Sequence, residues 1–383
     1  MALKTRFTKT LDIHNQLHEA IYLINVGHNL SEELAYAAFQ QVLLMEPGKS
    51  YESGEKNIFM GVLLNGVMAK GPTVEEVTGF IRAAFSLDGY TPRSLSEIHM
   101  EGKNNKVIGL AGSGKKGIKT MNVSSCAGIV AASLGVYIAK PCSSSTSSVT
   151  GSAEFIELVG ANTDLDSKIM TSVMKKTGLG FYKIENRIPN FNSHYGGLFY
   201  APHVLSFGLA AMILPFRPSN MLYGLAHPNV ELSIKVMQRF NYKNAMTVST
   251  TDDGVHFLDE IGIFGTTSII GIRDGVVGQL IHVQPSEILD LPRYGRGSIK
   301  PGSSVEQNIK LGVDVLAGKG EPAREDIVAV NAGTLLYLAE KAEGLEDGYY
   351  KAKREIKSGR PIDKLYEFIK ATSGRTRSLS KYL

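Results

Sequence analysis

The hydrophobic positions of the first ninety residues follow the spacing of amphipathic helices. Ser31 precedes the run EELAYAAFQQVLL and provides an N-cap hydroxyl, with acidic side chains in the first turn. Apolar side chains between residues 59 and 67 recur at helical spacing. Thr73 and Glu76 have the spacing of a capping box, in which each side chain satisfies the other residue's backbone N–H. We therefore expect residues 1–90 to form a helical domain.

After Gly89 the pattern changes to short apolar runs separated by glycine-rich turns. Residues 107–110 are typical of a strand, 126–134 of a helix and 136–139 of the next strand. The runs 245–249, 268–272 and 279–283 fit the same scheme, and helices are expected at 305–316, 323–340 and 348–358. The pattern predicts an α/β fold, with a small helical N-terminal domain and a large α/β domain (91–383) built on a mostly parallel central sheet.

One apolar stretch is long enough to be considered as a membrane span. It is GGLFYAPHVLSFGLAAMILPF, residues 196–216. Pro202, His203, Ser206 and Pro215 interrupt it, so a buried helix is the better interpretation and no membrane partner is expected.

Composition and charge limit the function classes. The 383 residues are 43% hydrophobic and 20% charged, as in globular proteins, and the length favours a second domain. A net charge of +4 suits an anionic small molecule and is weak for a dedicated nucleic-acid binder. The two cysteines, Cys126 and Cys142, lack the spacing of a zinc site or a disulfide framework. With no export signal in MALKTRFTKTLDIHNQL, we expect a cytoplasmic protein with reduced thiols.

Two loops rich in glycine and hydroxyl groups follow the first two predicted strands. The first, GLAGSGKKGIKTMNVSS at 109–125, leads into a helix and contains Lys115, Lys116 and Lys119. Exposed backbone N–H groups at a helix N-terminus favour phosphate, although the loop matches neither a P-loop nor a dinucleotide fingerprint. A solvated loop with structural glycines fits this spacing equally well. The second loop, KPCSSSTSS at 140–148, is expected at the same edge of the sheet, which suggests a ligand with two phosphate groups.

An acidic pair, Asp259 and Glu260, lies in the glycine-flanked segment FLDEIGIFGTT. Mg²⁺ is commonly held by one or two carboxylates together with substrate phosphates. When the pair is considered without the rest of the sequence, a solvated acid pair in a turn is a more common explanation than a metal site.

In this order, the segments resemble the motifs of the anthranilate phosphoribosyltransferase family, which also includes the pyrimidine nucleoside phosphorylases. The family's GTGGD and T-x-N-I-S-T motifs correspond to GSGKK at 112–116 and TMNVSS at 120–125. Its KHGNR and GSAD motifs correspond to KPCSS at 140–144 and GSAE at 151–154. Its GLDEIS corresponds to FLDEIG at 257–262, and its N-A-x-x-L-Y helix to NAGTLLY at 331–337, with one residue inserted. KGPTVEEVTGFIRA from Lys70 resembles the family's KGET-x-EEI segment, so nearly the whole chain is covered.

The resemblance implies an enzyme that moves phosphoribose from phosphoribosyl pyrophosphate to an aromatic or heteroaromatic acceptor, with Mg²⁺ and release of pyrophosphate. It also implies a homodimer formed through the helical domain, which residues of about 198–222 would join. The implied substrate-binding residues are Gly112, Ser113, Gly114, Lys115, Thr120, Asn122, Ser124, Ser125, Ser143, Ser147 and Ser148. Lys140 is an implied catalytic residue, and we also expect a catalytic role for Lys116, which stands where the family has Asp. The implied metal ligands are Ser124, Asp259 and Glu260.

The chain departs from the family pattern at both substrates. Lys115 and Lys116 replace Gly and Asp, so they either neutralise the leaving pyrophosphate or prevent the loop from binding in the family's manner. Pro141 and Ser143 replace the His and Asn of KHGN, and the family's anthranilate-binding arginine falls near Phe207. The acceptor is therefore expected to differ from anthranilate. An inserted segment, 183–197, offers replacement contacts, with Arg187 expected to bind substrate; the other candidates are Asn190, Asn192, His194, Tyr195 and, outside the segment, Arg217.

Two alternatives stay open at this point. The chain could be an authentic anthranilate phosphoribosyltransferase of tryptophan biosynthesis with rebuilt acceptor contacts. It could also be a non-catalytic relative that binds nucleic acid through Lys115, Lys116 and Lys119. The acidic pair argues against the second alternative, because carboxylates repel a polyanion, so a nucleic-acid partner is not expected.

Overall fold

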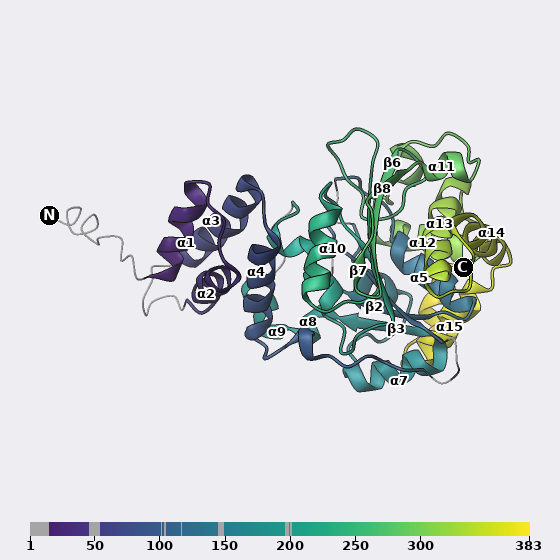
Figure 1. Cartoon of the computed structure of the whole chain (residues 1–383). Coiled ribbons are helices and arrows are strands. Elements are labelled where there is room, and N and C mark those ends of the chain that lie inside the picture. Colours follow the sequence, from purple (N-terminus) through teal and green to yellow (C-terminus); the bar gives the residue numbers. More distant parts are fainter. Residues whose placement is uncertain are drawn as a thin grey trace.

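The N-terminal part of the chain is a helical bundle at one end of the molecule (Figure 1). The computed structural model describes residues 15–45, 54–100, 102, 105–115, 117–144, 149–195, 199 and 201–383. The bundle contains α1 (Gln16–Asn25), α2 (Glu32–Leu43), α3 (Glu55–Lys70) and α4 (Val74–Ser86). Ser31 caps α2, and Thr73 with Glu76 forms the capping box of α4, both as predicted. The domain boundary at residue 90 stays a prediction.

The second part is built on a mainly parallel sheet, which confirms the predicted α/β fold. Within the described residues the sheet has eight strands, in the order β3-β2-β1-β4-β5-β6-β7, and β8 also pairs with β6. The parallel strands are β1 (Val107–Gly112), β2 (Tyr137–Cys142), β3 (Leu179–Lys183), β4 (Asn220–Gly224) and β5 (Ala245–Thr251). The antiparallel strands are β6 (Thr266–Arg273), β7 (Val276–Val277) and β8 (Ile281–Val283).

The prediction that runs 268–272 and 279–283 continue the parallel scheme is wrong. A parallel connection needs a crossover of a dozen or more residues, and the links from β6 to β7 (274–275) and from β7 to β8 (278–280) are far shorter than that. Asp274 and Gly275, which join β6 to β7, both have positive φ, at 51° and 82°. Two successive residues with positive φ form the kind of tight turn that joins antiparallel strands.

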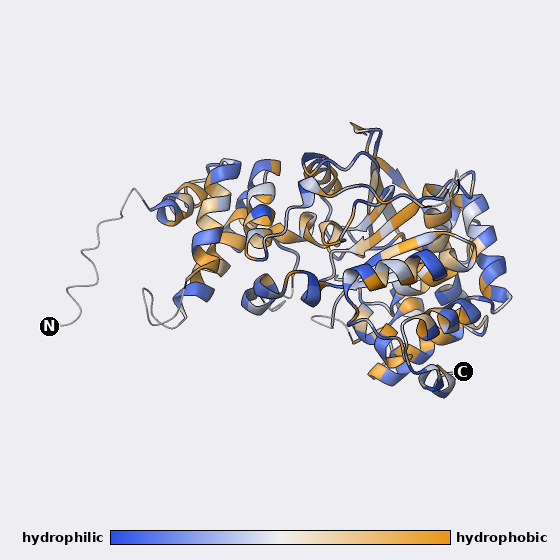
Figure 2. Ribbon diagram, turned by 90° about the horizontal axis from the view of Figure 1, so that it is seen from below, coloured by the Kyte–Doolittle hydropathy of each residue, from blue (hydrophilic) through white to orange (hydrophobic). Residues whose placement is uncertain are grey.

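Helices cover both faces of the sheet (Figure 1). One face carries α5 (Val123–Ser133), with α12 (Val305–Leu316), α13 (Pro322–Leu338), α14 (Leu345–Lys357) and α15 (Pro361–Ala371) packed around it. On the other face α10 (Val230–Arg239) lies between the sheet and α4. Figure 2 shows hydrophobic strands at the centre and polar residues on the outer helices. The remaining helices are α6 (Ser152–Leu158), α7 (Ser167–Thr177), α8 (Ile184–Arg187), α9 (Pro189–Tyr195), α11 (Pro285–Ile288), η1 (Pro92–Ser94), η4 (Arg296–Ile299) and η5 (Thr376–Lys381).

The stretch 196–216 is buried over most of its described part, but it is not the helix that the sequence predicts. It forms two short 3₁₀ turns, η2 (Val204–Phe207) and η3 (Leu209–Met212), of which η2 packs against α3, α4 and α10. The Ser206 hydroxyl accepts a hydrogen bond from the backbone N–H of His203, which begins a new turn inside the stretch. Among the described helices, none has the length and hydropathy required to cross a bilayer.

Candidate active site

The two predicted phosphate loops and the acidic pair meet in one cavity at the carboxyl ends of β1 and β2. The first loop follows β1, the second follows β2, and Asp259 and Glu260 follow β5. We call this space the loop cavity. It is lined by Ala111, Gly112, Gly114, Lys115, Thr120, Met121, Asn122, Ser124, Lys140, Pro141, Ser143, Ser144, Thr150, Gly151, Ser152, Ile184, Ala210, Asp259 and Glu260. Segments about 145 residues apart in the chain thus face one another.

The first loop closes directly onto the acidic pair. The backbone N–H of Gly114 donates to Asp259 Oδ2 at 2.9 Å. A Cβ atom at Gly112 would lie 2.6 Å from the same oxygen, so a larger residue there would displace the carboxylate from this position. Gly114 and Lys115 both have positive φ, at 62° and 55°. Glycine adopts this conformation without strain, whereas Lys115, which replaces a glycine of the GTGGD motif, adopts it at a cost of about 1–2 kcal/mol.

The turn that carries the acidic pair is held from two sides. The Thr250 hydroxyl on β5 donates to the Glu260 carbonyl oxygen (2.8 Å) and accepts from the Gly262 N–H (2.9 Å). From α13, Asn331 Oδ1 accepts from the Ile261 N–H (3.0 Å), and its Nδ2 donates to the Ile261 carbonyl (2.9 Å). These contacts explain how two carboxylates can be kept in a buried position. With the Ser124 hydroxyl in the same cavity, they form a set of hard oxygen donors that fits Mg²⁺.

We expect Asn331→Ala to loosen this turn and to lower the free energy of unfolding by about 2–3 kcal/mol, because it leaves the N–H and the carbonyl of Ile261 without their partner. Chemical denaturation measures the effect. Thr334→Ala is the control, since Thr334 lies one turn later on α13 and its buried hydroxyl bonds only within the helix, to Val330. Equal losses in the two variants would show that the contacts to the acidic turn add nothing.

The second loop brings a buried cation to the cavity. Lys140, on β2, is 3% exposed, and its Nζ donates to Ser124 Oγ at 3.1 Å. Ser124 lies in the first turn of α5, where no side chain caps the helix. Asn122 Nδ2 donates to the carbonyls of Thr150 and Gly151 (3.2 and 3.3 Å) and so ties the two loops together. A helix N-terminus, hydroxyl groups and an ammonium group therefore converge, an arrangement that favours an anion.

Most of the predicted site residues lie together. Those that line the loop cavity are Gly112, Gly114, Lys115, Thr120, Asn122, Ser124, Lys140, Ser143, Asp259 and Glu260. Ser113 lines the neighbouring cavity, and Ser125 is buried within α5. Lys116, Ser147 and Ser148 lie outside the described residues.

Arg187 lines neither the loop cavity nor the neighbouring cavity that contains Ser113, contrary to its predicted role in substrate binding. Its guanidinium donates to the Ile213 carbonyl at 3.2 Å and lies over the Tyr90 ring at 5.1 Å. Arg217 is likewise engaged elsewhere, with the carbonyls of Pro92 and Asn241. Both arginines stabilise backbone segments, so neither supplies the missing guanidinium.

A second, more apolar space adjoins the loop cavity, and we call it the apolar cavity. It is lined by Ser113, Lys115, Ser143, Ile184, Glu185, Ile188, Phe191, Asn192, His203, Leu205, Ser206, Leu209, Ala210 and Tyr223. Lys115, Ser143, Ile184 and Ala210 line both spaces. Among the candidates of the inserted segment whose side chains the structure describes, Asn192 reaches it. Glu185 and His203 also line it, and the sequence pattern does not indicate them, because neither belongs to a motif and the lost arginine suggests a cationic replacement.

Lys115 points toward the apolar cavity. Its Nζ lies 3.1 Å from His203 Nε2 and 5.8 Å from the centroid of the Phe199 ring. Burial lowers the pKa of the Lys115 amine to about 8. Burial, and secondarily the charge of Lys115, holds the pKa of His203 well below its usual value. Two basic side chains are therefore adjacent in a partly dehydrated place, where their protonated forms are disfavoured.

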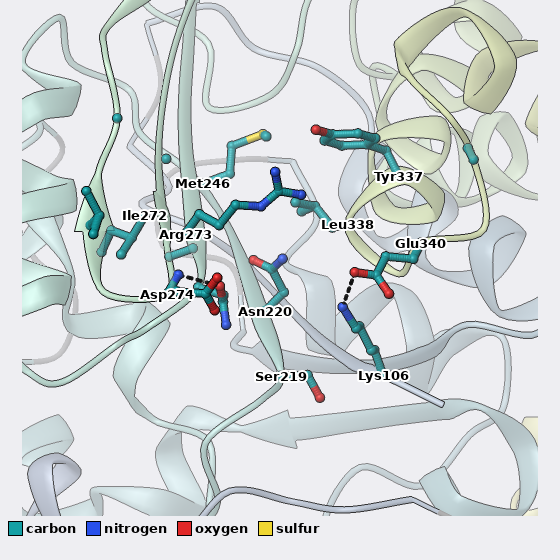
Figure 3. Close-up of a pocket in the computed structure, with 16 residues that line it drawn as sticks. Lys106, Ser219, Asn220, Met246, Ile272, Arg273, Asp274, Tyr337, Leu338 and Glu340 are labelled. Carbon is teal, nitrogen blue, oxygen red and sulfur yellow. Dashed lines mark hydrogen bonds and ion pairs between the residues drawn. The ribbon is translucent and has the colours of Figure 1, made fainter. Parts of the chain in front are cut away.

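A further cavity lies at the opposite end of the strands (Figure 3). Arg273 reaches into it between Met246 and Leu338, and Lys106 pairs with Glu340 at 2.5 Å. It contains neither of the two loops nor the acidic turn. Ligands of open α/β folds bind at the carboxyl ends of the strands, so the loop cavity is the better candidate site.

The comparison with known families agrees with this geometry. Residues 104–362 match the family described as "Glycosyl transferase family, a/b domain". The chain belongs to this family. The match runs from just before β1 to the start of α15 and includes both loops and the acidic turn. The family resemblance inferred from the sequence motifs is thereby confirmed.

Curated proteins are similar to this chain along nearly their whole length. An anthranilate phosphoribosyltransferase of Methanothermobacter thermautotrophicus is 28% identical over 360 residues, 90% of this chain and 95% of the relative. One from Pseudoalteromonas translucida is 25% identical and covers 95% of this chain and 96% of its own.

Solved structures share the fold. That of anthranilate phosphoribosyltransferase from Thermus thermophilus has a TM-score of 0.72 at 21% identity, covering 92% of this chain and 99% of its own. The enzyme from Saccharomyces cerevisiae in complex with PRPP and Mg has a TM-score of 0.73 at 17% identity, covering 94% and 98%.

Proposed function

We propose that the protein is a Mg²⁺-dependent phosphoribosyltransferase that moves phosphoribose from phosphoribosyl pyrophosphate to an aromatic or heteroaromatic acceptor and releases pyrophosphate. The observation that carries the proposal is the meeting of the two loops and the acidic pair in the loop cavity. The curated relatives and solved structures named above are anthranilate phosphoribosyltransferases, and one of the structures contains PRPP and Mg.

In this proposal the loop cavity binds the donor. The N-terminus of α5, the Ser124 hydroxyl and the Lys140 ammonium receive phosphate oxygens. When pyrophosphate leaves C1, negative charge grows on the leaving group and positive charge on the ribose ring. Donors that are already oriented stabilise the first charge without reorganisation, and an acceptor in the apolar cavity is positioned to attack C1. No protein nucleophile is needed.

Asp259, Glu260 and Ser124 would hold the Mg²⁺ ion, which supplies charge neutralisation for the pyrophosphate. Both carboxylates are nearly buried, at 8% and 5% exposure, and line the loop cavity beside Ser124. Carboxylate and hydroxyl oxygens are suitable ligands for Mg²⁺, which takes its remaining ligands from substrate phosphates and water. The position of Asp259 against the N–H of Gly114 also links the metal site to the first loop.

Two further features belong to the proposal. Tyr22 and Val26 of α1 and Ile58 of α3 expose half or more of their surface, which supports a homodimer formed through the helical part. Both cysteines are free and buried, in keeping with a cytoplasmic location.

The direct test is release of pyrophosphate from phosphoribosyl pyrophosphate with Mg²⁺ and a panel of aromatic acceptors. We expect Lys140→Met to lower kcat/KM for the donor about a hundredfold, because methionine keeps the volume but removes the charge beside Ser124. Lys106→Met, just before β1 at the other end of the sheet, is the matched control. No release with any acceptor, or equal effects of the two variants, would contradict the assignment.

A further inference from the structure

The hydrogen bonds of His203 favour the neutral form of the Lys115 amine beside it. The backbone N–H of Leu205 donates to His203 Nδ1 at 3.3 Å, so this nitrogen carries a lone pair. A neutral imidazole then carries its hydrogen on Nε2, which faces Lys115 Nζ at 3.1 Å. An ammonium group has no lone pair to accept that hydrogen. The arrangement is therefore that of a neutral amine, whose single lone pair faces His203 and must turn away from it to accept a proton from a third molecule.

The surroundings of Lys115 agree with this assignment. Its side chain is 9% exposed, and burial lowers its pKa to about 8, so the free amine gains population as the pH rises through that value. Among the described residues that line these spaces, the ionisable groups around it are Glu185, His203 and Tyr223 in the apolar cavity, Lys140, Asp259 and Glu260 in the loop cavity, and Lys119 and His227 in the space beside them. Because Lys115 lines both cavities, its amine lies at the boundary between donor and acceptor.

Glu185 gives the apolar cavity a second chemical feature. Its Oε1 accepts a hydrogen bond from the Ser144 N–H at 2.9 Å. Its Oε2 is buried and has no hydrogen-bond partner within the described part of the chain. A buried carboxylate oxygen without a donor is costly, so a ligand that brings an N–H group would be favoured. A ligand carboxylate would instead be repelled, and no arginine is found among the described residues that line this cavity.

We propose that the acceptor is an uncharged aromatic molecule that carries N–H groups, that Glu185 selects it, and that Lys115 removes its proton. This inference rests on the proposed phosphoribosyl transfer. As an acceptor nitrogen forms its bond to C1, the C1–oxygen bond breaks and its electron pair leaves with pyrophosphate. The N–H proton moves to the Lys115 amine. The resulting ammonium group then lies beside the loop cavity, where the negative charge of the leaving group develops.

The test compares two acceptors that differ in one group. Anthranilate carries a carboxylate, and 2-aminobenzamide carries an uncharged carboxamide with N–H donors on the same ring. We expect the wild-type protein with Mg²⁺ and phosphoribosyl pyrophosphate to turn over 2-aminobenzamide with a kcat/KM at least about tenfold higher than for anthranilate. A preference for anthranilate, or binding of neither probe by the donor complex, would overturn the inference.

Two variants separate the roles of the side chains. Glu185→Gln is expected to reduce the preference for 2-aminobenzamide at least about tenfold, because an amide no longer repels a carboxylate. Lys115→Gly is expected to lower kcat for 2-aminobenzamide about a hundredfold and to leave the dissociation constant of the donor within about threefold. Glycine also suits the positive φ at this position, so the fold is retained.

The pH profile provides an independent readout. A general base must be deprotonated, so the wild-type rate should rise with pH and level off at or above pH 8, since the charge of the bound donor raises the pKa of Lys115. Lys115→Gly should lose this rise. If Lys115→Gly instead weakens donor binding more than tenfold with kcat unchanged, Lys115 is a phosphate contact and the inference fails. Failure of the wild-type protein to bind the donor would contradict the proposed function itself.

Discussion

Replacement of Asp259 by Asn together with Glu260 by Gln is expected to lower phosphoribosyl transfer about a thousandfold and to remove its dependence on Mg²⁺. Both side chains keep their size, so the packing of the turn is retained. Thr250 and Asn331 bind the backbone of this turn rather than its carboxylates, and the substitutions leave those contacts intact. The loss should therefore appear in a titration of activity against Mg²⁺ and not in the unfolding curve.

Asp252→Asn is the matched control for this loss. Asp252 lies in the same connection between β5 and β6, but it pairs with Arg296 near the surface and does not line the loop cavity. It should keep nearly full activity. If the double variant retains activity that still depends on Mg²⁺, the metal is bound elsewhere and the proposed ligands are wrong.

Gly112→Ala is expected to lower kcat/KM for phosphoribosyl pyrophosphate about a hundredfold, with a loss of only about 1 kcal/mol in the free energy of unfolding. The added Cβ would meet Asp259 Oδ2 at 2.6 Å. That oxygen is the end of a side chain and can move aside, so the fold tolerates the substitution. The movement takes the carboxylate away from the N–H of Gly114 and from the proposed metal position.

Two other glycines make this prediction sharper. A Cβ at Gly224 would lie 1.7 Å from the backbone oxygen of Asp259, which cannot move without the turn, so Gly224→Ala should cost about 3 kcal/mol of unfolding free energy or more. Gly61 on α3 has open space around it, and Gly61→Ala should leave activity unchanged and stability equal or higher. Full activity of Gly112→Ala would show that the Asp259 carboxylate is not required where it lies.

The parts of the site that could be predicted from the sequence are those that local chemistry specifies. Glycine-rich loops after strands place backbone N–H groups at the carboxyl edge of a parallel sheet, so Gly112, Asn122 and Ser124 could be assigned to one edge. The acidic pair could be assigned to the same place only through the family motif, because nothing local in FLDEIG indicates that the turn packs onto the first loop.

The parts of the site that could not be predicted depend on which contacts the long, flexible side chains make in the folded protein. Lys115 was expected beside pyrophosphate, yet its amine reaches His203, a residue 88 positions away. Arg187 was expected at the substrate, yet its guanidinium binds a backbone carbonyl and the Tyr90 ring. In both cases the sequence identifies a charged side chain near the site, but tertiary packing determines which group that side chain contacts. The antiparallel direction of β6 likewise depends on pairing across the sheet edge.

Calorimetric titration of the wild-type protein with phosphoribosyl pyrophosphate, with and without Mg²⁺, tests the central claim most directly. The account predicts saturable binding that requires Mg²⁺, and its loss when Asp259 and Glu260 are replaced by Asn and Gln. Absence of binding in the presence of Mg²⁺, or equal binding without the metal, would contradict it.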